Sequence, residues 1–91
     1  MKYIIITEYN DTSGYTEEKL YDLCCSIGNC EQLTPHSFIV SCEQDAIYIR
    51  DAIKNSPYDV DRIFVILADL PAAWRNVMCD NSDLKALLHE S

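Results

Sequence analysis

Two short runs of β-branched and aromatic residues constrain the fold more than any other feature of the chain. Residues 3–7 read Tyr-Ile-Ile-Ile-Thr, and residues 63–68 read Ile-Phe-Val-Ile-Leu-Ala. Such residues favour strands, and strand side chains alternate between the two faces of a sheet. Both runs are therefore apolar on both faces. We predict that the first run is a central strand covered on both sides, and that the second is the last strand of the domain.

A first helix is expected soon after the first strand. Its apolar stripe repeats with the i, i+3, i+4, i+7 spacing of a helix face and consists of Leu20, Leu23, Cys24 and Ile27. Thr16 is the expected N-cap, and Gly28 is the expected left-handed stop.

The second helix is expected to begin near Ser41, where Gln44 would complete a capping box. Its buried stripe would consist of Ala46, Ile49 and Ile53. Three leucines near the C-terminus suggest a further amphipathic helix, capped by Ser82. The residues of that stripe are Leu84, Leu87 and Leu88.

Two more strands are expected between the helices, at residues 30–35 and 37–42. The element order is then β-α-β-β-α-β, which is the split βαβ or ferredoxin-like plan of an α+β protein. In that plan one antiparallel sheet carries both helices on one face. We expect a single domain over residues 1–91, with a core of about residues 2–70 and a C-terminal extension over residues 71–91.

The second sheet face lacks a helical cover in this plan, although the strands are apolar on both faces. A contiguous exposed apolar face is unusual in a soluble monomer. A second copy of the sheet around a two-fold axis would cover it, so a homodimer is expected; the C-terminal extension is the alternative cover. The predicted interface residues are Tyr3, Ile5, Tyr9, Phe64, Ile66 and Trp74.

The charge balance argues against nucleic acid as a partner. The chain has 15 acidic and 7 basic side chains, a formal net charge of −8, and no run of basic residues, whereas nucleic-acid binding draws most of its affinity from cationic side chains. The acidic excess is expected to be solvated charge that keeps a small protein soluble; an acidic surface that docks a basic protein partner or mimics nucleic acid is the alternative. The longest purely apolar run, residues 63–68, is too short to cross a bilayer.

The five cysteines do not suggest a disulfide framework or a zinc site. Their number is odd and no Cys-x-x-Cys spacing occurs. Cys24 and Cys42 are expected to be small core residues. The N-terminus becomes polar by Thr7 and does not read as a signal peptide. We therefore expect a reducing, cytoplasmic compartment.

Several short motifs resemble a known group of proteins. A strand of the form Tyr-Ile-Ile-x-x-acidic spans residues 3–8, and Leu-Tyr-x-Leu follows at residues 20–23. Then come Gly28, the Ser-Phe-Ile-Val strand at residues 37–40, and Ala-Ala-Trp at residues 72–74. This pattern resembles the SinR-like small proteins, which are related in fold to VapD toxins and to the CRISPR-associated Cas-two endoribonucleases. The resemblance covers roughly residues 3–75.

The resemblance implies a ferredoxin-like homodimer and a site at the end of the first strand. In the nuclease members an acidic residue there comes from both subunits and holds a divalent metal, which relieves carboxylate repulsion and activates water. The matching residue is Glu8, with Asp11 just beyond it as a further metal ligand. A Mg²⁺-dependent ribonuclease or deoxyribonuclease with paired Glu8 residues is thus one expectation, and Mg²⁺ would be its only cofactor.

The flanking residues favour a different function. Lys2 is the only cation among the first eighteen residues, whereas nuclease members hold the phosphate backbone with basic residues. His36 and His89 are expected to be solvent-exposed and form no catalytic constellation. The main expectation is therefore a catalytically degenerate binding or interaction module.

Overall fold

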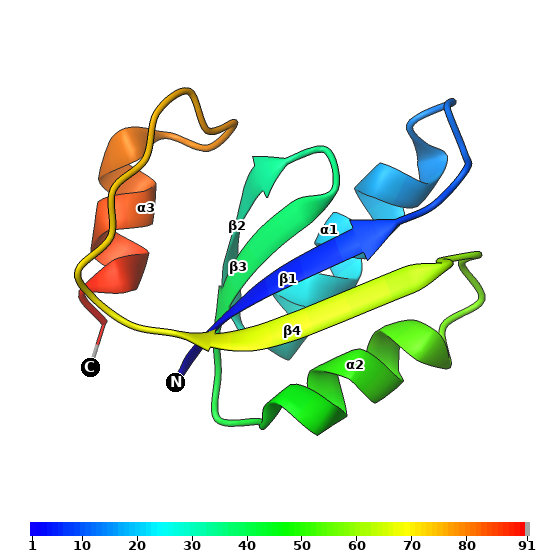
Figure 1. Cartoon of the computed structure of the whole chain (residues 1–91), viewed down its shortest axis with the longest axis horizontal. Coiled ribbons are helices and arrows are strands. Elements are labelled where there is room, and N and C mark those ends of the chain that lie inside the picture. Colours follow the sequence, from blue (N-terminus) through cyan, green and yellow to red (C-terminus); the bar gives the residue numbers. More distant parts are fainter. Residues whose placement is uncertain (91) are drawn as a thin grey trace.

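The computed structural model describes residues 1–90 and confirms the predicted ferredoxin-like α+β plan with a C-terminal extension (Figure 1). The elements are β1 (Lys2–Glu8), α1 (Tyr15–Ile27), β2 (Asn29–Thr34), β3 (Ser37–Ser41), α2 (Ala46–Lys54), β4 (Arg62–Ala68) and α3 (Asn81–Leu88). Among these described residues, no helix has the length and apolar character needed to span a membrane.

The sheet has the strand order β2-β3-β1-β4, and every neighbouring pair is antiparallel. β1 lies between β3 and β4, so the predicted central position of the first strand is confirmed. Ile5 of β1 stands opposite Phe38 of β3 on one side and Val65 of β4 on the other. β2 and β4 form the two edges, and β2 ends next to Pro35, which cannot donate to a sheet hydrogen bond.

The main core lies between the sheet and the helices α1 and α2. Ile5, Leu20, Phe38 and Ile49 are completely buried there. Each such side chain contributes about 1.5–3 kcal/mol when it leaves water. Tyr3 belongs to the same cluster and is 4% exposed. The prediction that Tyr3 and Ile5 face a partner is therefore wrong, because this side of β1 faces the chain's own helices.

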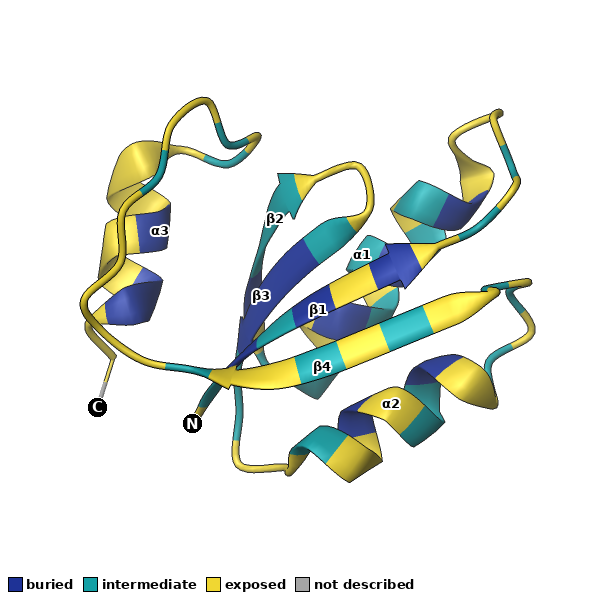
Figure 2. Cartoon of the chain, in the orientation of Figure 1, coloured by how far each residue is buried: buried dark blue, intermediate teal, exposed yellow. Residues whose placement is uncertain are grey.

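α3 covers part of the opposite sheet face. A second buried cluster forms there between Ile39 of β3 and three leucines of α3, with Ile4 and Leu33 packed against it. The three leucines are Leu84, Leu87 and Leu88. Figure 2 shows the buried side of α3 turned toward β2 and β3, while β4 alternates between half-buried and exposed residues. The expectation that β1 is covered on both sides is thus only partly met, since Ile6 stays 47% exposed.

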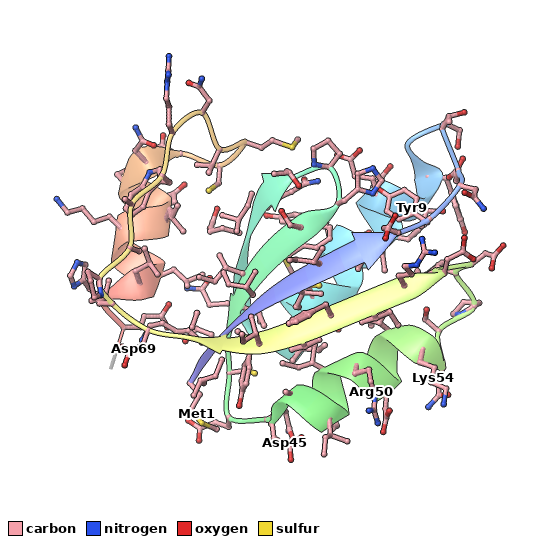
Figure 3. All side chains as sticks on the ribbon, in the orientation of Figure 1. Met1, Tyr9, Asp45, Arg50, Lys54 and Asp69 are labelled. Atoms are coloured by element: carbon pink, nitrogen blue, oxygen red, sulfur yellow. The ribbon has the colours of Figure 1, made fainter. Side chains whose placement is uncertain are left out.

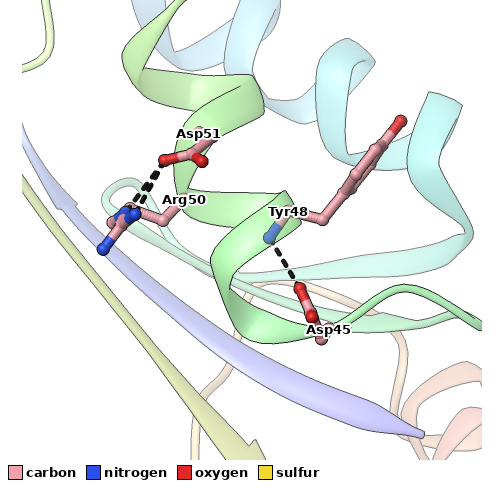
Figure 4. A network of polar contacts seen from close by, with 4 residues as sticks. All are labelled: Asp45, Tyr48, Arg50 and Asp51. Carbon is pink, nitrogen blue, oxygen red and sulfur yellow. Dashed lines mark hydrogen bonds and ion pairs between the residues drawn. The ribbon is translucent and has the colours of Figure 1, made fainter.

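Aspartates cap the second and third helices, where serines were expected. The Asp45 carboxylate accepts a hydrogen bond from the Tyr48 amide at 2.8 Å (Figure 4). The Asp80 carboxylate accepts one from the Ser82 amide at 2.9 Å. A carboxylate satisfies a free amide and also interacts favourably with the helix dipole. Ser41 does not cap α2, because it still belongs to β3.

Gly28 connects α1 to β2 in an extended conformation and not in the expected left-handed one, since its φ is −174°. Glycine is required here because the surrounding atoms leave no space for a side chain. A Cβ atom at this position would lie 2.8 Å from the Cys42 Cβ and even closer to the Ser41 carbonyl oxygen. The turn therefore brings the start of β2 against the end of β3 more closely than any larger residue permits.

We expect Gly28→Ala to destabilise the protein by roughly 1–3 kcal/mol, the usual range for overpacking, because the new methyl group overlaps main-chain atoms of β3. Urea unfolding followed by circular dichroism measures the change. Ser26→Ala, at an exposed position of the same helix end, is the matched control and should shift the midpoint far less. Equal midpoints for Gly28→Ala and the wild type would show that this close approach does not exist in solution.

Candidate functional site

The candidate site lies where β1 ends, on the sheet face that carries α3. Glu8 is the last residue of β1 and stands opposite Arg62, the first residue of β4. The Arg62 Nη1 atom lies 3.4 Å from both carboxylate oxygens of Glu8. Both side chains are mostly exposed, so this ion pair contributes less than about 1 kcal/mol to stability. It does, however, place a cation beside the carboxylate that the resemblance implies as a metal ligand.

Two open hollows flank Glu8. One has a volume of about 390 Å³ and extends toward β4 over Ile6, Arg62 and Phe64. The other has a volume of about 470 Å³ and extends toward the turn between β2 and β3, where His36 lies. The end of β1 is therefore a shallow mixed surface of apolar, acidic and basic groups.

Tyr9 ties the end of β1 to the turn between β2 and β3. Its hydroxyl donates a hydrogen bond to the Pro35 carbonyl at 2.7 Å, and its ring centroid lies 4.6 Å from that of His36. Burial, followed by the charges of Glu17 and Asp11, raises the pKa of Tyr9. Tyr9 also packs at the margin of the helix-side core, so its ring is already engaged within the chain. Figure 3 marks it at the end of β1.

The N-cap residue of α1 is Gly14 and not the expected Thr16, and the carboxylate that accepts hydrogen bonds at the start of this helix comes from Asp11. Its carboxylate accepts hydrogen bonds from the amide and hydroxyl of Ser13 at 2.9 and 2.6 Å, and from those of Thr16 at 2.9 and 3.0 Å. These bonds, led by that of the Ser13 hydroxyl, hold the pKa of Asp11 well below its usual range. Gly14 precedes the helix with a φ of 88°, a backbone conformation that glycine adopts without strain.

The proposed metal ligands Glu8 and Asp11 thus have different partners in one chain. Both oxygens of the Asp11 carboxylate already accept hydrogen bonds, and the Glu8 carboxylate faces Arg62. Among residues 1–90, no group of three or more His, Cys, Asp or Glu side chains has a metal-binding arrangement. A site built from two Glu8 residues requires two chains and stays a prediction.

The open strip is the name we give to Ile6, Phe64 and Ile66. Ile6 stands opposite Phe64, and Ile66 stands opposite Ile4, so all three side chains lie on the sheet face that α3 covers only in part. Their exposed fractions are 47%, 49% and 50%. Of the six predicted interface residues, Phe64 and Ile66 are the two that are large, apolar and exposed on this face.

Trp74 has an intramolecular role in this structure. It is half-buried against the α3 cluster, and its indole N–H donates to the Asn81 side-chain oxygen at 3.1 Å. It also lines an apolar pocket of about 320 Å³ between the sheet and the segment that leads to α3. The other apolar residues of this pocket are Ile4, Leu33, Ile39, Ala72, Ala73, Val77, Leu84 and Leu88.

Arg62 and His36 were not expected beside Glu8. Arg62 could have been found from the topology, because in adjacent antiparallel strands the start of one lies opposite the end of the other. His36 reaches the site through the turn between β2 and β3: its carbonyl accepts hydrogen bonds from the amide and hydroxyl of Thr7. That contact depends on tertiary structure and has no local signal in the sequence. His36 is exposed, as expected.

Comparison with protein-family models, with curated proteins and with solved structures found no match for this chain. The resemblance to SinR-like and Cas-two proteins therefore stays a prediction.

We expect Asp11→Ala to lower the urea midpoint at neutral pH, because the first turn of α1 loses its hydrogen-bond acceptor. Since the folded-state pKa of Asp11 lies below the usual value of 3.8, the stabilisation is fully present above that value. It is lost as the pH falls toward the folded-state pKa. The midpoint difference between wild type and Asp11→Ala should therefore shrink between about pH 4 and about pH 2.

The control for this experiment is Asp22→Ala, which removes a carboxylate from the exposed surface of the same helix. It should change the midpoint little at any pH. A midpoint difference for Asp11→Ala that is the same at neutral and acid pH would contradict the capping role of this carboxylate.

Proposed function

We propose that the chain is a non-catalytic interaction module that acts as a homodimer through the open strip. The observation that carries this proposal is the half-exposed state of Ile6, Phe64 and Ile66 on two hydrogen-bonded strands. Large apolar side chains next to one another on a sheet face mark an interaction surface more often than scattered single ones do. A sheet-to-sheet contact would remove all three from water.

The charges on this face support a second copy as the occupant. The residues of β1 and β4 that point to this side are Lys2, Ile4, Ile6, Glu8, Arg62, Phe64, Ile66 and Ala68. They include two cations and one carboxylate, although the whole chain carries a net charge of −8. The acidic excess therefore lies elsewhere, and the single carboxylate among these residues, that of Glu8, is already paired with Arg62 of its own chain. A basic partner would find its electrostatic complement on other surfaces.

The geometry of the strip also suits a two-fold axis. In such a contact the same patch from each copy packs against itself, and the three residues are all apolar, so the strip is compatible with its own copy. β4 is an edge strand, and its outer backbone groups have no strand partner within the described chain. Natural edges of this kind are usually covered or paired, and a dimer centred near β4 would shield this one.

We expect the wild type to sediment as a dimer at micromolar concentration and Phe64→Lys to sediment as a monomer. A buried aromatic residue at an interface centre contributes roughly 2 kcal/mol or more, which corresponds to at least about thirtyfold in the dissociation constant. Sedimentation velocity over a concentration series measures this.

Ile47→Lys is the matched control, because Ile47 is 60% exposed on α2, and α2 packs on the sheet face opposite to the strip. It should leave the dimer intact. Circular dichroism verifies that both variants remain folded. A wild type that stays monomeric throughout the concentration series would refute the proposed assembly.

Metal-dependent nucleic-acid cleavage is the second candidate, favoured by the position of Glu8 on the same face as the strip. A dimer there would bring the two Glu8 carboxylates to one side of the assembly. Two features weigh against it. Arg62 already pairs with Glu8, and the other cation among the β1 and β4 residues of this face, Lys2, lies at the far end of β1, whereas a phosphate backbone needs several cations close together.

We expect no Mg²⁺- or Mn²⁺-dependent cleavage of RNA or DNA, and identical behaviour of wild type and Glu8→Gln. The substrates are labelled single- and double-stranded oligonucleotides analysed on denaturing gels. Cleavage that requires the metal and disappears in Glu8→Gln would replace the non-catalytic proposal with the nuclease. The dimer would then remain a separate question, answered by sedimentation.

A further inference from the structure

Cys25 and Cys30 approach each other at the junction between α1 and β2. Cys25 belongs to the last two turns of α1 and is exposed, whereas Cys30 is the second residue of β2 and is 4% exposed. Their sulfur atoms lie 2.7 Å apart, inside van der Waals contact. The tight passage through Gly28 produces this approach, because it folds the start of β2 back beside the end of the helix.

We propose that Cys25 and Cys30 form a reversible redox site that reacts with low-molecular-weight disulfides of the glutathione class and closes an intramolecular disulfide. The site is independent of the proposed dimer. It lies at β2, one edge of the sheet, while the open strip lies on the central strand β1 and on β4, the opposite edge.

The difference in solvent exposure between the two thiols determines the order in which they react. Cys25 is accessible to a dissolved disulfide, and Cys30 beneath it is not. Burial, together with the neighbouring Cys25, raises the pKa of the Cys30 thiol above its usual value. Because the thiolate is the attacking species in exchange, Cys25 makes the first contact with the oxidant and Cys30 completes the reaction.

The chemistry consists of two exchange steps that balance. In the first, the Cys25 thiolate attacks one sulfur of the small disulfide, and the protein holds a mixed disulfide while one small thiolate leaves. In the second, the Cys30 thiolate attacks the Cys25 sulfur and displaces the other small thiolate. The two leaving thiolates take up the two protons that the cysteines lose. The small disulfide is reduced by two electrons, and the cysteine pair is oxidised by two.

The other cysteines are unsuited to this reaction. Cys24 neighbours Cys25 in sequence, but it is completely buried in the helix-side core, and burial raises its pKa to about 12. The Cys42 thiol points toward the Gln44 carbonyl at 3.7 Å. Cys79 packs in the α3 cluster on the opposite sheet face. The proposal therefore predicts oxidation of the pair Cys25 and Cys30 and not of the other cysteines.

The test is to incubate the folded protein with oxidised glutathione, quench with acid and alkylate the free thiols under denaturing conditions. The mass of the intact chain is then measured by mass spectrometry. The wild type has five free thiols, and we expect three to remain alkylatable, with no glutathione attached. Treatment with a reducing agent should restore all five. A wild type that keeps five thiols, or that retains a glutathione adduct, would overturn the proposal.

Single substitutions identify the pair. Cys25→Ser, at an exposed position, should keep all four of its remaining thiols, whereas the matched control Cys79→Ser should lose two of its four. Cys30→Ala should accumulate one glutathione adduct that cannot resolve. Because Cys30 is buried and its substitution also disturbs the core, Cys25→Ser is decisive: if it still loses two thiols, Cys25 is not part of the site.

Discussion

β1 is hydrogen-bonded along both edges and apolar on both faces, and the rest of the molecule is arranged around that strand. One face, with Tyr3 and Ile5, is sealed by α1 and α2. The other face is sealed by α3 only where it adjoins β3, so Ile6 and its neighbours on β4 remain half-exposed. The chain therefore covers β1 completely on the helix side and only in part on the other side. Because apolar surface left in water is a free-energy cost, the uncovered part is where we place the partner.

Much of the fold could be predicted from local sequence, because strand and helix periodicities are local properties. The strands, both helices of the ferredoxin-like unit and the terminal helix appear where the apolar patterns indicate. Helix starts were predicted less well. At the start of each helix an aspartate carboxylate accepts a hydrogen bond from a free backbone amide, where a Ser or Thr side chain was expected. At α1 this residue is Asp11, which lies several residues before the helix. Gly28 was recognised as a necessary glycine for the wrong reason, since the crowding comes from Ser41 at the end of β3 and from Cys42 just after it, which are distant in the sequence.

The site was less predictable, because it depends on which face of each strand meets which layer. When a strand is apolar on both faces, its sequence does not reveal whether the odd- or the even-numbered residues face the helices. For this reason Ile5 was expected at an interface, although it lies in the core. The pairing of Glu8 with Arg62 needs the strand register. The contact between Cys25 and Cys30 needs the turn between α1 and β2. Three cysteines lie close together at positions 24, 25 and 30, but their spacing alone did not show which of them meet.

The most direct measurement of the central claim is the solvent exposure of individual isoleucine methyl groups. A paramagnetic co-solute broadens the NMR signals of exposed methyls, and the experiment is repeated as protein concentration rises through the micromolar range. We expect Ile6 and Ile66 to become protected as the dimer forms, while Ile47 on α2 stays broadened. If Ile6 and Ile66 remain as exposed as Ile47 at every concentration, no second copy covers the strip and the central claim is contradicted.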